Sequence, residues 1–220
     1  NLDNDVSGVT VDQLSTTTKE AATFSCCDGW ASFTVKLDTE PYSQVVLDLA
    51  SLDTTEGIID VPGSTIDNSL TFTDLTWNTP QTVYVKGVDD DVFDYDLVNG
   101  QRVDVRYNVT VTTNVANADT KYRNLDRSIR FQNINNDFIG VTVDSIGRMD
   151  DANNTLTAEN EIRCGELAPP PLGFSCKTAV LKIRLTSQPK KTVLFTINSN
   201  DVTEALTTPN IMAFTSSDWS

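Results

Sequence analysis

The chain contains no histidine among its 220 residues. Histidine is the usual proton shuttle near neutral pH and the commonest zinc ligand, so its absence excludes Ser-His-Asp chemistry and most catalytic zinc sites. The sequence also shows no nucleophile beside a plausible base and no glycine-rich phosphate-binding loop. We therefore expect that this chain is not an enzyme.

Positive charge and long apolar runs are scarce as well. The chain has 16 lysines and arginines against 31 aspartates and glutamates, which gives a formal net charge of -15 at pH 7. An acidic chain of this kind repels nucleic acid and anionic lipid, and it attracts cations. No run of about 18 apolar residues occurs, so we expect no segment to contact or span a membrane.

Strong helix formers are few, whereas apolar residues alternate with polar ones in many short runs. The clearest run extends from Val103 to Val111, and Phe33, Val35 and Leu37 form another. Glycine, proline, asparagine and aspartate separate these runs at the spacing of an antiparallel sandwich. The pattern predicts an all-β fold of antiparallel β-sandwiches.

One stretch of sequence occurs twice. Four segments of the first half return in the same order in the second half, which is hard to obtain by chance. The pairs are Asn4–Asp12 with Asn136–Asp144, Phe24–Cys26 with Phe174–Cys176, Leu37–Pro41 with Leu185–Pro189, and Thr71–Thr73 with Ala213–Thr215. In the last pair, Trp77 follows the first segment and Trp219 follows the second. The pattern is typical of a tandem-repeat protein.

The phase of the repeat predicts the domain boundaries. We interpret residues 1–5 as the tail of a preceding repeat, 6–137 as one complete repeat and 138–220 as a second, truncated repeat. The second copy is longer by a loop insertion around residues 152–173. We accordingly expect the chain to be a slice of a longer polypeptide.

Cysteine and glycan signals favour an extracellular or cell-surface location. The four cysteines are an even number, and Asn108 and Asn153 each stand in an Asn-x-Thr sequon, which makes them candidate glycosylation sites. Secreted proteins are where disulfides and N-linked glycans form. Together with the acidity, these features predict an extracellular glycoprotein.

The pairing of the cysteines stays open in part. A disulfide between Cys164 and Cys176 would tie the insertion to the strand that follows it. Such a bond would contribute on the order of 3 kcal/mol by the chain-entropy estimate. Cys26 and Cys27 are adjacent, and they form a strained vicinal disulfide, remain free thiols, or bond to residues outside this chain.

The strongest chemical signal is an acidic run that follows the predicted strand over 83–88. Five carboxylates fall within eight residues at a strand end, and close pairs among them repel by roughly 1–4 kcal/mol. These residues are Asp89, Asp90, Asp91, Asp94 and Asp96. Such a run is tolerated as a solvated loop or by binding a hard cation. Calcium, which takes six to eight oxygen ligands at flexible geometry, suits it best.

The acidic run and a later segment resemble the Calx-beta domain. The shared pattern is a strand, then Asp-Asp-Asp-x-Phe-acid-x-acid, and later Asn135-Asn136-Asp137 before Gly-Val-Thr at the module boundary. The resemblance implies a seven-stranded immunoglobulin-like sandwich with calcium bound at one end. It implies as ligands the five aspartates of the run together with Asn135, Asn136 and Asp137.

The chain departs from the calcium-sensing members of that family at the module boundary. Those members carry three acids where this chain has Asn135, Asn136 and Asp137. Asparagine offers a neutral carbonyl oxygen, so we expect calcium affinity of the extracellular grade, roughly 10⁻⁴–10⁻³ M. A loop carboxylate from Asp53 or Glu56 could add to the ligands.

These observations predict a structural role. We expect tandem immunoglobulin-like, Calx-beta-like sandwiches of an extracellular filament or cell surface, with calcium stiffening the junctions. The partners would be neighbouring repeats and copies of the same chain. The sequence also resembles Calx-beta-like repeats of large secreted proteins of algae and protists, including flagellar hairs (mastigonemes) and sexually induced surface proteins. The alternative is a cell-surface adhesin that binds glycans or a partner cell through its loop ends.

Overall fold

The computed structural model describes residues 5–20, 29–62, 68–99, 101–114, 116–117, 119–146 and 180–220. Within these residues the regular elements are strands and one 3-10 turn, η1 (Thr120–Tyr122), and there is no α-helix. The all-β expectation is therefore confirmed. None of the described residues forms a helix of the length and apolarity needed to cross a membrane.

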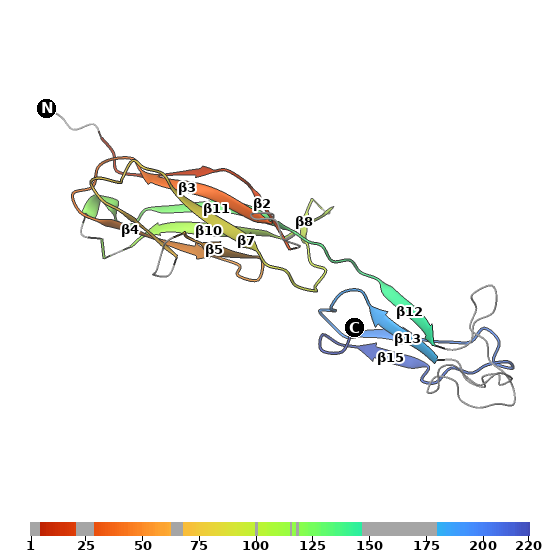
Figure 1. Cartoon of the computed structure of the whole chain (residues 1–220). Helices are drawn as coiled ribbons and strands as arrows, with labels where there is room; N and C mark the ends of the chain where they lie inside the picture. The colour runs from red at the N-terminus through yellow and green to blue at the C-terminus, as the bar shows by residue number, and fades with distance from the viewer. Residues whose placement is uncertain are drawn as a thin grey trace. The chain divides into compact units, whose positions relative to one another are not determined.

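The chain divides into two compact units. The first comprises Asn1–Asp90 and Asp94–Asn136, and the second comprises Asp91–Phe93 and Asp137–Ser220. Figure 1 shows the strands of both units.

The first unit consists of two sheets. One sheet is antiparallel and has the order β1 (Val9–Gln13), β3 (Trp30–Leu37), β7 (Gln81–Gly87), β5 (Gly57–Asp60). The other has the order β2 (Thr17–Lys19), β11 (Asp126–Ile134), β10 (Arg106–Thr113), β4 (Val45–Ser51), β6 (Ser69–Phe72). A small separate hairpin follows the acidic run and pairs β8 (Asp96–Val98) with β9 (Gln101–Val103).

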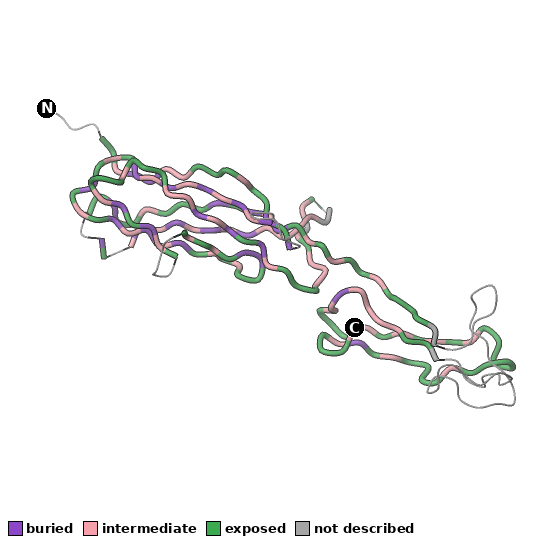
Figure 2. The backbone as a smooth tube through the Cα atoms, in the orientation of Figure 1, coloured by how far each residue is buried: buried purple, intermediate pink, exposed green. Residues whose placement is uncertain are grey.

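The alternating apolar residues of these strands form one core between the two sheets. Burial alternates along β3 and along β10, as the period of two predicts. The Phe33 ring of one sheet lies 6.1 Å from the Phe131 ring of the other. Figure 2 shows buried residues recurring along the strands of this unit. The first unit is thus a two-layer β-sandwich.

The first strand of this sandwich is split between the sheets. β1 pairs antiparallel with β3, whereas β2 pairs parallel with β11. The step between them is held by the hydroxyl of Ser15, which accepts a hydrogen bond of 2.8 Å from the Ser32 amide. The parallel register sets Thr18 opposite Asn133. It thereby brings the residues after β2 to the end of β11.

The second unit contains two hairpins in its described residues. β12 (Val141–Ile146) pairs with β13 (Val180–Leu185), and β14 (Val193–Thr196) pairs with β15 (Ile211–Phe214). Their registers match those of the first unit. Val141 faces Leu185 as Val9 faces Leu37, and Val193 faces Phe214 as Val45 faces Phe72. The repetition in sequence is therefore also a repetition of strand pairing.

The two units also share a turn that the sequence comparison did not identify. Asp53 accepts hydrogen bonds from the Thr55 amide and hydroxyl at 3.1 and 2.6 Å. Asp201 accepts the same pair from Thr203 at 3.0 and 2.6 Å. Aspartate commonly stabilises turns in this way, by accepting from the backbone two residues on. The residue after each threonine is a glutamate, Glu56 or Glu204.

Several predicted features lie outside the described residues. These are Cys26, Cys27, Cys164, Cys176, the Asn153 sequon and the insertion around residues 152–173. The other sequon residue, Asn108, is half-buried on β10 between the buried residues Tyr107 and Val109. Its side chain therefore belongs to the outer face of the sheet, and its glycosylation stays a prediction.

Candidate metal centre

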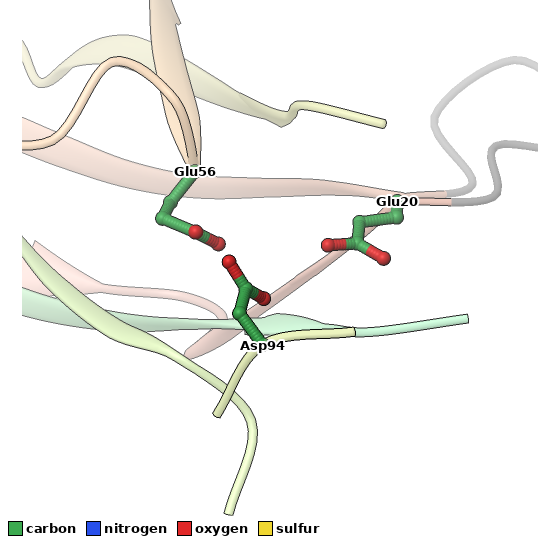
Figure 3. A group of neighbouring side chains, drawn as sticks. All are labelled: Glu20, Glu56 and Asp94. Atoms are coloured by element: carbon green, nitrogen blue, oxygen red, sulfur yellow. The ribbon is translucent and has the colours of Figure 1, made fainter. Parts of the chain in front are cut away.

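Three carboxylates converge at one end of the first unit. Each of Glu20, Glu56 and Asp94 offers an oxygen, and these oxygens lie within 4.8 Å of one another. Figure 3 shows the three side chains pointing toward one another. Glu20 and Glu56 are each 4% exposed, and Asp94 is half-buried. We call these three residues the carboxylate cluster.

Glu20 reaches the cluster because β2 runs alongside β11. The Glu20 amide donates a hydrogen bond of 3.1 Å to the Ile134 carbonyl, which continues the parallel pairing beyond Lys19. The Glu20 carboxylate accepts a 2.9 Å hydrogen bond from the Asn136 amide. This side chain is thus tied to the last residues of the first unit.

Glu56 is placed by the turn that precedes β5. The amide of Gly57 bonds the Asp53 carbonyl at 3.1 Å, and the amide of Val88 bonds the Glu56 carbonyl at 3.1 Å. A side chain at Gly57 would collide with the Tyr107 ring. Glycine is therefore required here for the turn to approach the core.

Asp94 comes from the acidic run and is held by the residues that follow β11. The side-chain amide of Asn135 donates to the Asp94 backbone carbonyl at 2.9 Å and to its carboxylate at 3.1 Å. These two hydrogen bonds hold Asp94 in place but add no positive charge to the cluster. Three segments distant in sequence meet at this end of the sandwich.

A buried polar network supports the cluster from the core side. The Asn133 side-chain amide donates to Glu56 at 3.3 Å and to the Val88 carbonyl at 3.1 Å. The Thr18 hydroxyl donates to the Asn133 side-chain carbonyl at 2.9 Å and lies 3.0 Å from the Tyr107 hydroxyl. Burial raises the pKa of Tyr107 to about 12, so its hydroxyl stays neutral. Such a network fixes the orientation of Glu56.

The environment of Glu56 disfavours its charged form. Burial raises the pKa of Glu56 to about 7, and the nearby negative charge of Asp94 adds to this effect. The charges of Asp53 and Asp90 act in the same direction, whereas the hydrogen bond from Asn133 opposes it. At neutral pH, without a cation, Glu56 is therefore about half protonated, and a bound cation would favour its charged form.

The donor set could hold a hard cation such as calcium. The cluster offers only oxygen ligands, which suits a hard cation and does not suit zinc, since zinc prefers histidine and cysteine. Three carboxylates that bind through one or two oxygens each, completed by water, reach the six to eight oxygens of calcium coordination. Magnesium demands a stricter octahedron. Glu20, Glu56 and Asp94 would hold the ion.

The predicted ligands are distributed unevenly around this cluster. Asp94 belongs to it and Asn135 contacts it. Asp89 is exposed and accepts a 3.1 Å hydrogen bond from the Asn136 side chain. Asp90 is exposed too, and its charge reaches Glu56.

The remaining predicted ligands are not members of the cluster. The Asp96 carboxylate accepts a 2.8 Å hydrogen bond from the Arg106 amide. Asp96 therefore joins β8 to the start of β10. Asp91 and Asp137 group with the second unit. None of these three is a member of the carboxylate cluster.

Glu20 was not predicted as a ligand from the sequence. It stands in a polar stretch with no fixed spacing to the acidic run, and no pattern in that stretch marks it. Glu56 was predicted only as an additional loop carboxylate. Both are brought to Asp94 by pairings between distant strands.

Comparison with known proteins does not identify the chain. No protein-family model matches it. No curated protein matches it.

Proposed function

We propose that the chain belongs to a structural repeat protein of an extracellular filament or cell surface, with calcium stiffening the end of each module. The observation that carries this proposal is the carboxylate cluster, because its members contact Asn135 and Asn136, the last residues of the first unit. A cation held there would act on the segment through which the chain leaves the module.

The mechanism is electrostatic. Bound calcium neutralises Glu20, Glu56 and Asp94 and joins the end of β2, the turn before β5 and the acidic run. Without the cation, close pairs of carboxylates repel by roughly 1–4 kcal/mol each. The repulsion loosens the hydrogen bonds from Asn135 and Asn136, and the exit segment becomes a hinge.

The strand arrangement supports an immunoglobulin-like module of the Calx-beta kind. Two facing sheets and a first strand that passes from one sheet to the other fit such a sandwich. The matched registers of the two units support a tandem array. Filament-forming and matrix proteins commonly use such arrays, in which each module contacts its neighbours.

Calcium binding is tested on the full chain by thermal unfolding. We expect the first unit to melt higher in millimolar calcium than in chelator, because the ion binds the folded state alone. Glu56→Gln should abolish this difference. Asp74→Asn is the matched control. Asp74 is exposed in the turn before β7, whereas the acidic run follows the opposite end of β7. Equal melting curves in calcium and chelator would refute the site.

Stiffening is tested separately by small-angle X-ray scattering. We expect the spread of molecular dimensions of the full chain to narrow when calcium is added, and Glu20→Gln to remove the effect. If calcium raises the melting temperature but leaves the spread of dimensions unchanged, the ion binds without a mechanical role. The structural proposal would then fail while the metal site stands.

A further inference from the structure

The second unit repeats two strand pairs of the first unit, but the apolar residues of these strands are mostly less buried. Val9 and Phe33 are 3% and 0% exposed in the first unit, and their counterparts Val141 and Leu181 are 43% and 46% exposed. Figure 2 shows mainly exposed and half-buried residues along the described strands of the second unit. Some counterparts of fully buried core residues are therefore exposed in this unit, whereas Phe214, the counterpart of Phe72, is 7% exposed.

The first unit shows what covers these positions in a complete sandwich. β3 pairs with β1 on one edge and with β7 on the other, and β4 pairs with β6 on one edge and with β10 on the other. β10 and β11 supply Val109 and Phe131, which face the core from the second sheet. Residues of β7, β10 and β11 thus close the core over the two hairpins.

The described strands of the second unit lack this cover. β13 has a single strand partner, β12, and β14 has a single strand partner, β15, among the residues that the structure describes. Among the described residues, no second strand pairs with the other edge of β13 or of β14, although the Leu185 amide of β13 donates to the Trp219 carbonyl at 2.9 Å. An edge of this kind recruits another strand.

We propose that this open face is a docking surface for a three-strand β-segment of the repeat's own type, equivalent to β7, β10 and β11. The face is formed by the counterparts of first-unit core residues, which are Val141, Leu181, Ile183, Leu185, Val193, Phe195 and Met212. The inference stands independently of the calcium site, because it rests on strand pairing and apolar burial alone.

The registers select this occupant over others. The β12–β13 and β14–β15 pairings keep the registers of β1–β3 and β4–β6, so the free edges stand where β7 and β10 would pair. A helix would leave both edges unsatisfied. A second copy of this unit would offer the same two hairpins and not the strands that fit them.

The test adds strands equivalent to β7, β10 and β11 to the 220-residue chain. Residues 79–137 of the first copy are fused after Ser220, because Trp219 and Ser220 correspond to Trp77 and Asn78. We expect amide hydrogen exchange in β13 and β14 to slow by about tenfold or more relative to the 220-residue chain. The control is the same fusion with Val83→Asp and Val109→Asp in the added copy, which should give no protection.

Two outcomes overturn the proposal. The first is exchange in β13 and β14 that is no slower in the fusion than in its control. The second is that the unfused chain forms a dimer in sedimentation. For this outcome, Leu181→Asp must abolish the dimer, and Lys182→Asp on the opposite face of β13 must leave it intact. That result would assign the face to a second copy. The proposal is supported if the unfused chain is a monomer that binds an apolar dye, and if Leu181→Asp lowers this binding whereas Lys182→Asp does not.

Discussion

The two units place the same residue types in the same strand registers and reach different states of burial. Phe33 and Leu181 occupy matching positions, yet Phe33 is 0% exposed and Leu181 is 46% exposed. Glu56 and Glu204 follow the same turn, yet Glu56 is buried and Glu204 is exposed. The same strand pairs thus form in both units, whereas burial depends on further strands of the module.

The difference also explains why a carboxylate cluster forms in the first unit. The environment of Glu56 raises its pKa. Burial in the closed core is the largest cause, and the nearby charge of Asp94 from the acidic run adds to it. Glu204 stands at the matching place without these neighbours among the described residues. A site of this kind is a property of the closed sandwich.

The largest expected effect comes from core truncation at matching positions. Phe33→Ala should destabilise the first unit by about 3–5 kcal/mol, because it leaves a cavity in a closed core. Leu181→Ala should cost far less, since much of that side chain already contacts solvent. Urea unfolding followed by hydrogen exchange of peptides from each unit measures both. Similar costs at the two positions would contradict the difference in burial.

The next effect concerns the pH dependence of Glu56. Its folded pKa of about 7 lies above the ordinary value of 4.5, so the stability tied to its protonated form is complete below about pH 4.5 and is lost as pH rises through 7. In chelator at pH 8, Glu56→Gln should stabilise the first unit by about 2–3 kcal/mol, with little effect at pH 4.5. Unfolding curves at both pH values provide the measurement.

Glu204→Gln is the matched control for that experiment. Because Glu204 is exposed, we expect no change in the stability of either unit at pH 8 and no change in the response to calcium. A stabilisation equal to that of Glu56→Gln would show that lower net charge, and not relief of the cluster, is responsible.

A smaller effect is expected from the polar network behind the cluster. Tyr107→Phe removes one partner of the Thr18 hydroxyl, which keeps its bond to Asn133. The loss should be about 0.5–1.5 kcal/mol in the first unit. The second unit should be unaffected. Calcium titration of the same variant should show reduced affinity, because the network orients Glu56 through Asn133.

The smallest effect is expected at the shared turn. Asp53→Ala and Asp201→Ala each remove the same two hydrogen bonds to a threonine, and both aspartates lie in the same local geometry. We expect small and similar shifts of the unfolding midpoint in the two units. A much larger shift for Asp53→Ala would mean that this turn also supports the carboxylate cluster.

Sequence patterns identify part of the candidate site. The acidic run and the boundary asparagines are visible as clusters of oxygen ligands, and the structure joins Asp94 to Asn135. Glu20 could not be recognised in this way, because its contact depends on the parallel pairing of β2 with β11. Asp96 illustrates the converse, since it belongs to the run by spacing and bonds the Arg106 backbone instead.

The sequence by itself determined the all-β character and the repeat. The all-β character follows from alternation along single strands, and the repeat follows from segments that return in the same order. Tertiary structure alone decided which apolar residues are buried and which carboxylates meet. Both depend on strands that are distant in sequence: β7, β10 and β11 close a core in the first unit, and Glu20, Glu56 and Asp94 converge where those strands end.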